Sequence, residues 1–208
     1  MTDPYLLLTP VLALLVLALA RFVACGGDPF TSSGNPRKPL EKAFVYSRDL
    51  GEPRTNFTGW VGMVIHVGDK PLTVTQLGRI MLTASTAEHQ VKLVEPAGMG
   101  GGADLGMPVT IPIGTTSDPD SLGFAYAPLQ PAVVLSANTD YYVVSHEAAM
   151  GDVFHDFETT TVTTTEVAEV TSGVFYDDDM PGPGYQPAGG SKNTYGPVDF
   201  KYEEPATE

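Results

Sequence analysis

Residues 129–156 read L-Q-P-A-V-V-L-S-A-N-T-D-Y-Y-V-V-S-H-E-A-A-M-G-D-V-F-H-D and carry the clearest structural signal in the chain. An apolar run ends at Leu135, and the next residues, 137–140, are rich in turn formers. The second run, 141–145, is β-branched and aromatic, which is typical of a strand. We therefore predict two antiparallel strands joined by a hairpin turn.

Short segments of the same kind extend outward in both directions, separated by Gly, Pro, Asn and Asp. We predict strands at 59–67, 72–82, 89–95, 109–113, 122–126, 132–135, 140–147, 153–157, 167–176 and 198–202. The 22 Gly and 18 Pro suit a chain of many short elements. The fold class that follows is all-β, an antiparallel two-sheet β-sandwich of jelly-roll type preceded by one N-terminal hydrophobic helix.

The N-terminal region has a different composition from the rest. Residues 5–24, Y-L-L-L-T-P-V-L-A-L-L-V-L-A-L-A-R-F-V-A, have about the length that crosses a bilayer. We predict a membrane anchor or signal segment at 1–25, a flexible linker at 26–42, the sandwich at 43–203 and a tail at 204–208. Three fates of the apolar segment are open: an uncleaved anchor, a lipoprotein signal with Cys25 as the lipidated residue, or a helix that packs against its own copies.

Two signals bear on location, and they disagree. Arg21, Arg37, Lys38 and Lys42 follow the apolar segment, and the positive-inside rule would leave the domain in the cytoplasm. The domain itself is rich in Thr, Gly and Tyr and poor in Lys, a composition common outside bacterial cells. Cys25 is the single cysteine, so an internal disulfide is excluded. We expect a membrane-anchored domain on the extracytoplasmic side, at the cell surface or in the periplasm.

The net charge of −14 is unevenly distributed. Up to Arg54 there are six Lys and Arg against five Asp and Glu, and from Thr55 onward five against twenty. Such an acidic domain repels phosphate backbones, which argues against a nucleic-acid partner.

Several motifs together suggest a family. They are G-W-V-G-M at 59–63, V-T-Q-L-G-R at 74–79, H-Q-V-K-L-V at 89–94, L-S-A-N-T-D-Y-Y-V-V-S-H-E at 135–147, G-D at 151–152 and Y-G-P-V-D-F at 195–200. In this order they resemble the jelly-roll-like β-sandwich modules of unknown function found at the C-terminal ends of bacterial secreted and cell-surface proteins. The resemblance covers residues 57–202, and it implies binding, adhesion or display.

Catalytic signatures are weak. Ser145, His146 and Asp152 match the residue types of a hydrolase triad, but Ser145 ends the strand-forming run 141–145 and no G-x-S-x-G elbow is present. The four histidines lack the spacing of a zinc site. We expect no enzyme activity.

A structural calcium site is the one metal hypothesis that the sequence favours. Glu147, Asp152 and Asp156 cluster around a short loop, and Asp177 to Asp179 form a second acidic group. Calcium prefers carboxylate and carbonyl oxygens of this kind. The competing interpretation is that these acids are solvated loop residues.

Aromatic residues are the candidates for ligand binding, because sugar rings stack on flat aromatic faces. Tyr185 and Tyr195 flank a Gly- and Pro-rich loop, where we expect them to be exposed. Trp60 lies in an alternating strand, where core packing competes with a binding role. These three are the predicted ligand-binding residues, for a glycan or a protein ligand.

The threonine-rich run E-T-T-T-V-T-T-T-E at 158–166 has high β propensity and predicts an edge strand open to a neighbour.

The first hypothesis for function is a membrane-anchored surface module with a non-catalytic binding or adhesion role. The alternative is a structural subunit of a surface or virion assembly, which self-associates through its N-terminal helix and edge strands.

Overall fold

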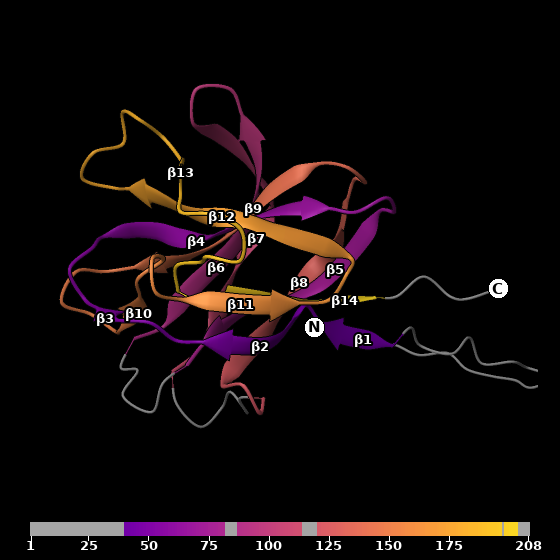
Figure 1. Cartoon of the computed structure of the whole chain (residues 1–208), viewed down its shortest axis with the longest axis horizontal. Helices are drawn as coiled ribbons and strands as arrows, with labels where there is room; N and C mark the ends of the chain where they lie inside the picture. Colours follow the sequence, from indigo (N-terminus) through magenta and orange to yellow (C-terminus); the bar gives the residue numbers. More distant parts are fainter. Residues whose placement is uncertain (1–39, 82–86, 114–119, 197, 204–208) are drawn as a thin grey trace, which may run out of the picture. The chain divides into compact units, whose positions relative to one another are not determined.

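The part of the chain that the structure describes contains antiparallel strands and no helix. The computed structural model describes residues 40–81, 87–113, 120–196 and 198–203, which belong to the compact unit Lys38–Glu208. The strands are β1 Glu41–Ala43, β2 Val45–Asp49, β3 Pro53–Arg54, β4 Gly59–Val67, β5 Leu72–Ile80, β6 His89–Ala97, β7 Gly101–Ile111, β8 Phe124–Leu135, β9 Asp140–Glu147, β10 Phe154–His155, β11 Thr161–Thr164, β12 Ala168–Asp177, β13 Gln186–Ala188 and β14 Val198–Glu203 (Figure 1).

Two sheets form the body of the sandwich. A six-stranded sheet has the order β13-β12-β4-β9-β6-β7, and a four-stranded sheet has the order β1-β14-β5-β8. Two further pairs, β10 with β3 and β11 with β2, make small two-stranded sheets. The prediction of an all-β antiparallel fold is confirmed, whereas the predicted N-terminal helix lies outside the described residues.

The strand pairs are nested within one another along the sequence. β6 pairs with β7, β5 with β8, β4 with β9, and β1 with β14. Successive pairs alternate between the six-stranded and the four-stranded sheet. This is the pattern of one long antiparallel ribbon wrapped over itself in two layers, with β12 and β13 added beside β4.

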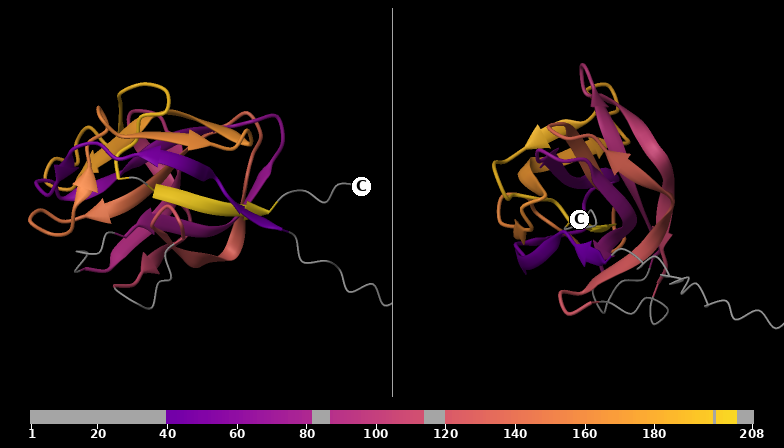
Figure 2. Two further views of the ribbon diagram at one scale, coloured as in Figure 1. Left: turned by 60° about the horizontal axis from the view of Figure 1, so that its bottom comes forward. Right: turned by 90° about the vertical axis from the view of Figure 1, so that its right-hand side faces the viewer.

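Alternation along each strand fills the space between the sheets, because successive side chains point to opposite faces. Met63, Ile65 and Val67 of β4 face inward, and Phe200 and Tyr202 of β14 meet them from the four-stranded sheet. These side chains belong to one core cluster that draws on both sheets, whose strands lie around one interior (Figure 2).

The predicted hairpin at residues 129–147 is wrong in its pairing. β8 pairs with β5 in the four-stranded sheet, and β9 pairs with β4 and β6 in the six-stranded sheet. The turn between them therefore crosses from one sheet to the other. Asn138 has φ 54° there, and its amide donates to the carbonyls of Val67 and Gly68. Local turn chemistry is the same for a hairpin and for this crossing, so the sequence could not separate them.

The predicted bounds of β4 and β9 agree with the structure at both ends, but two edge strands are longer than expected. β7 begins at Gly101, and β8 runs through Pro128 and Pro131, where the sequence predicted two strands. Proline is tolerated at these positions because both strands are at sheet edges. Their ladders are interrupted by register shifts opposite the pairs Val91/Leu93 and Val74/Gln76.

A buried ion pair joins the two sheets near the end of β9. Arg79 of β5 donates from Nε and Nη2 to the two carboxylate oxygens of Glu147 on β9, at 2.9 and 2.7 Å, and both side chains are fully buried. The Ser145 hydroxyl also donates to Glu147, at 2.8 Å. The guanidinium also donates to the carbonyls of Ile80 and Val153 and to the sulfur of Met81. Such a bidentate, fully bonded arrangement is what a buried charge requires.

A second buried carboxylate ties β2 to the outer face of β14. Asp199 accepts hydrogen bonds from the Val45 amide at 2.9 Å and from the Tyr126 hydroxyl at 2.6 Å. Burial raises the pKa of Asp199 to about 7, although these hydrogen bonds oppose the shift. Burial and the neighbouring Asp199 also raise the pKa of Tyr126, so its hydroxyl stays protonated.

The ion pair predicts an asymmetric mutational response. Arg79→Met leaves the Glu147 carboxylate buried without its counterion, and we expect a loss of about 3–5 kcal/mol in the free energy of unfolding. The double variant Arg79→Met/Glu147→Leu removes both charges and should lose less than the single variant. Urea unfolding measures both, with His66→Ala as the control, since it breaks only the exposed His66–Asp140 pair. A loss in Arg79→Met no larger than that of the control would contradict the assignment.

Asp199 predicts a pH dependence of stability. Because its folded pKa of about 7 exceeds the ordinary value of 3.8, the folded state holds a proton that the unfolded state releases. Its contribution to the free energy of unfolding therefore falls as the pH rises from about 4 through about 7. Urea unfolding at about pH 5 and about pH 8 should show a larger decrease for the native protein than for Asp199→Asn. Equal decreases in the two proteins would refute this role of Asp199.

Candidate functional site

At the end of the six-stranded sheet where β4 begins and β12 ends, the inward face is covered by loop residues. Val61 of β4 and Phe175 of β12 are directly paired across the ladder. Val61 belongs with Phe154 and Tyr195 to an apolar cluster separate from the main core, against which Phe57 and Phe175 pack. This end of the sandwich is therefore lined by side chains from four separate parts of the chain.

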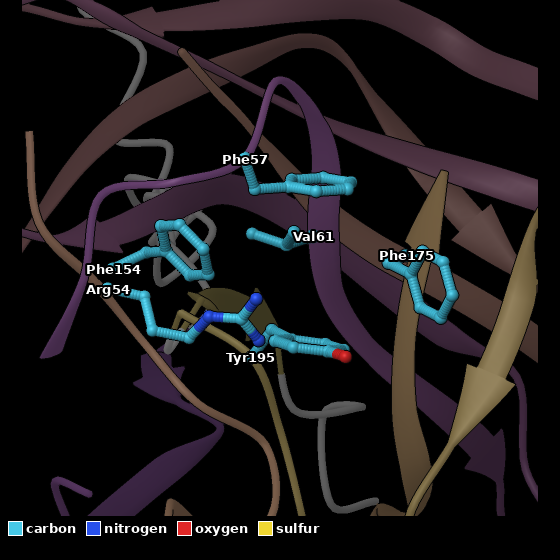
Figure 3. Close-up of a pocket in the computed structure, with 6 residues that line it drawn as sticks. All are labelled: Arg54, Phe57, Val61, Phe154, Phe175 and Tyr195. Carbon is cyan, nitrogen blue, oxygen red and sulfur yellow. The ribbon is translucent and has the colours of Figure 1, made fainter. Parts of the chain in front are cut away.

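A cavity of about 170 Å³ opens within this cluster. It is lined by Arg54, Phe57, Val61, Phe154, Phe175 and Tyr195 (Figure 3). In Figure 3, Phe57 and Tyr195 lie on opposite sides of the space, Val61 lies behind it, and Arg54 and Phe154 face Phe175 across it. We call this the aromatic pocket.

Edge-to-face contacts between rings fix the walls of the aromatic pocket. The Phe57 ring is 6.3 Å from that of Phe154 and 6.2 Å from that of Phe175, at interplanar angles of 62° and 85°. Tyr195 contacts Phe175 at 6.0 Å and Phe157 at 4.7 Å. The amide of Tyr195 also donates to the Gly62 carbonyl, at 3.0 Å. Rings in such contacts are held in place, so the pocket is formed in advance of any ligand.

Arg54 supplies the polar wall. Its guanidinium carbon lies 5.6 Å from the centre of the Phe154 ring, a cation–π geometry. Nη1 donates to Asp156 at 2.6 Å, and Nε donates to Asn56 at 3.1 Å. Burial, then the nearby Asp156, raises the pKa of Tyr195 to about 12, so its hydroxyl is neutral at physiological pH. The polar groups of the pocket are thus a fixed guanidinium and a phenol.

The predicted binding residues separate into two places. Tyr195 lines the aromatic pocket, whereas Trp60 and Tyr185 belong to a cluster on the opposite face of the six-stranded sheet. The expectation that Tyr185 and Tyr195 are exposed was wrong, since only 8% and 6% of their surfaces are accessible. Tyr185 packs between Tyr142 and Tyr176.

Trp60 is half-buried, and one face of its ring is covered. The Lys92 ammonium lies 4.1 Å from the ring centre, and the His146 ring contacts Trp60 at 5.0 Å. A stacking ligand would have to displace Lys92, so this ring is a poorer platform than the pocket.

The three predicted calcium ligands contact Arg or His side chains, and the His89 ring lies between two of them, with Nδ1 3.5 Å from Glu147 and Nε2 3.0 Å from Asp152. Glu147 binds Arg79, Asp152 binds His89 at 3.0 Å, and Asp156 binds Arg54. Among the residues that the structure describes, no group of three or more His, Cys, Asp or Glu side chains could hold a metal ion. The predicted calcium cluster is therefore not assembled.

The residues whose types match a hydrolase triad also bind different partners. Ser145 is fully buried and donates to Glu147, while Nε2 of His146 pairs with Asp178 at 2.8 Å. Asp152 pairs with His89 instead. These side chains form no nucleophile–base pair with one another.

Sequence reasoning missed most of the aromatic pocket. Arg54, Phe57, Val61, Phe154 and Phe175 were not singled out. One signal was present in the sequence: Val61 precedes Met63 and Ile65 by two and four residues along β4, so its side chain points to the same inward face. The contacts that complete the pocket join residues about a hundred positions apart, for example Arg54 and Asp156, at a separation of 102.

No family model, curated protein or solved structure matches this chain. The described residues also include no helix long and apolar enough to span a membrane. The segment 5–24 and Cys25 lie outside the described residues.

The ion pairs predict insensitivity to calcium. Because Glu147, Asp152 and Asp156 are already engaged by Arg79, His89 and Arg54, we expect the same Tm in excess calcium and in EDTA, with magnesium as the ionic-strength control. A calcium-specific rise in Tm that is lost in Asp156→Asn would restore the predicted site.

Proposed function

We propose that this chain is a membrane-anchored surface module with a non-catalytic binding role, and that its ligand enters the aromatic pocket. The observation that carries the proposal is the pocket itself, whose ring walls are fixed by mutual contacts and whose one charged wall is held by Asp156 and Asn56. Preformed apolar pockets with a few oriented polar groups are typical of ligand sites.

The fold supports a binding role. Strand orders β1-β14-β5-β8 and β4-β9-β6-β7, with nested pairs, correspond to a jelly roll. Jelly rolls occur in lectins, cupins and viral capsid proteins, so the fold is compatible with both functional hypotheses. It also agrees with the family resemblance of residues 57–202, which implies binding, adhesion or display.

The sheet edges favour the binding module over the assembly subunit. The edge strands β1 and β13 are each 3 residues long, and β7 and β8 carry prolines and register shifts. Such features block strand addition by a neighbouring molecule. The threonine-rich strand β11 is paired with β2, and Thr161 also bridges to Asn193. Assembly through open edges therefore has little support among the described strands.

The location is proposed from the sequence alone. The apolar segment 5–24 would anchor the chain, with Cys25 as the lipidation site if the segment is processed. The mass and membrane fractionation of the full-length protein, compared with Cys25→Ser, distinguish a lipoprotein from an uncleaved anchor. Recovery of the native protein in the soluble fraction would contradict anchoring.

The binding role predicts that filling the pocket abolishes ligand contact. Methyl-labelled protein is titrated with small planar aromatics and with methyl glycosides, and the Val61 methyl resonances are followed by NMR. We expect one class to shift these resonances, and the ring resonances of Phe154 and Phe175, in the native protein. In Val61→Phe, which fills the cavity and removes the valine methyls, the ring resonances of Phe154 and Phe175 are the readout, and they should lose the response. Val134→Phe makes the same change at an exposed site on β8 and should retain it.

Two results would contradict the binding role. One is that no probe of either class shifts Val61. The other is that the response of the remaining pocket resonances survives in Val61→Phe.

A further inference from the structure

We infer that the aromatic pocket binds one neutral aromatic ring that carries a hydrogen-bond acceptor, presented as a tyrosine side chain of a partner polypeptide. The inference rests on the proposed function and specifies its ligand. It follows from the size of the pocket, the chemistry of its walls, its charge and its rim.

The size of the pocket limits the ligand to a single ring. A cavity of roughly 150 Å³ lined by apolar side chains holds one benzene molecule, whereas drug-sized ligands occupy about 300–1,000 Å³. The aromatic pocket, at about 170 Å³, belongs to the first class. An oligosaccharide or a nucleotide cannot be enclosed.

The walls disfavour a sugar ring. Phe57, Val61, Phe154 and Phe175 offer no polar atoms, and the pocket's polar side-chain groups come only from Arg54 and Tyr195. A pyranose has hydroxyl groups around its whole edge, and each one buried without a partner costs about 1–3 kcal/mol. A planar aromatic ring has no such requirement and completes the edge-to-face contacts of the walls.

The charges around the pocket favour a neutral ligand. The Arg54 guanidinium opposes an ammonium group that would otherwise suit an aromatic cage. The same guanidinium is paired with Asp156 at 2.6 Å. The negative charge of Glu158 also acts at this place, since it contributes to the raised pKa of Tyr195. A free anion therefore meets carboxylates as well as a cation.

A hydrogen-bond acceptor on the ring has a partner in Arg54. The guanidinium donates from Nη1 to Asp156 and from Nε to Asn56, and its terminal nitrogens face the space between Phe57 and Tyr195 (Figure 3). A phenol oxygen at the end of a bound ring can accept from this group. Phenylalanine lacks that oxygen and would lose a hydrogen bond to a charged donor.

The rim points to a polypeptide rather than a free phenol. Met150 is 88% exposed, and its amide donates to the Thr55 carbonyl, in the segment that joins Arg54 to Phe57. Met150 is thus held beside the segment that carries two lining residues, and an exposed, adaptable apolar side chain at that position can add contact area to a chain that continues beyond the ring. The partner chemistry is thus a tyrosine with flanking backbone.

The test titrates the methyl-labelled protein with four probes: N-acetyl-tyrosinamide, N-acetyl-phenylalaninamide, methyl glucoside and benzyltrimethylammonium. We expect the tyrosine amide to shift the Val61 methyl resonances and to bind about tenfold more tightly than the phenylalanine amide. In Arg54→Met that preference should disappear, whereas Lys70→Met, which removes a charge at an exposed site, should keep it. If Arg54→Met loses its native spectrum, Arg54→Lys replaces it, because lysine keeps the charge without the planar fork.

The outcomes separate the two proposals. Tighter binding of the glucoside or the ammonium probe, or equal binding of both amides, would overturn the tyrosine inference and leave the binding module intact. No response of Val61 to any probe would remove the pocket as a ligand site. A short glycine peptide with one central tyrosine should bind more tightly than the amide and shift the Met150 methyl. Equal affinity without that shift would overturn the polypeptide partner.

Discussion

The buried Arg79–Glu147 pair is the constraint on which the functional end of this domain depends. A guanidinium with no solvent access must find all of its partners within the protein, and here they come from both sheets and from the loop after β9. The bond to the Val153 carbonyl is significant because Phe154 is the next residue. The pair that joins the sheets therefore also holds the strand that supplies one wall of the aromatic pocket.

The pocket combines a rigid sheet with loops fixed in place by charge. Val61 and Phe175 come from paired central strands, whereas Phe154 and Arg54 come from β10 and β3, which pair with each other. Loops carry most binding sites in proteins because the sheet below holds their positions. Here the cation–π contact and the Asp156 pair hold the side chains of the short strands β3 and β10 at the edge of an otherwise apolar interior.

The sequence could predict what depends on local composition, and little beyond it. β4 and β9 are apolar runs rich in β-branched and aromatic residues, so their bounds were predictable. The pairing across residues 137–140 was not, because Asn138 adopts φ 54° in a turn that could join strands of one sheet or of two. Tyr195 was a correct candidate for the pocket but for the wrong reason, since its burial comes from Phe157 and Phe175, far away in sequence. Long-range ion pairs such as Arg54–Asp156 leave no local pattern.

The most direct test of the account is a crystal structure of the domain soaked with N-acetyl-tyrosinamide. The account predicts density for one ring between Phe57 and Tyr195, with its hydroxyl within hydrogen-bond distance of the Arg54 guanidinium. Density over Trp60 with an empty pocket, or a pocket whose rings have collapsed onto one another, would contradict the claim that this end of the sandwich is a preformed ligand site.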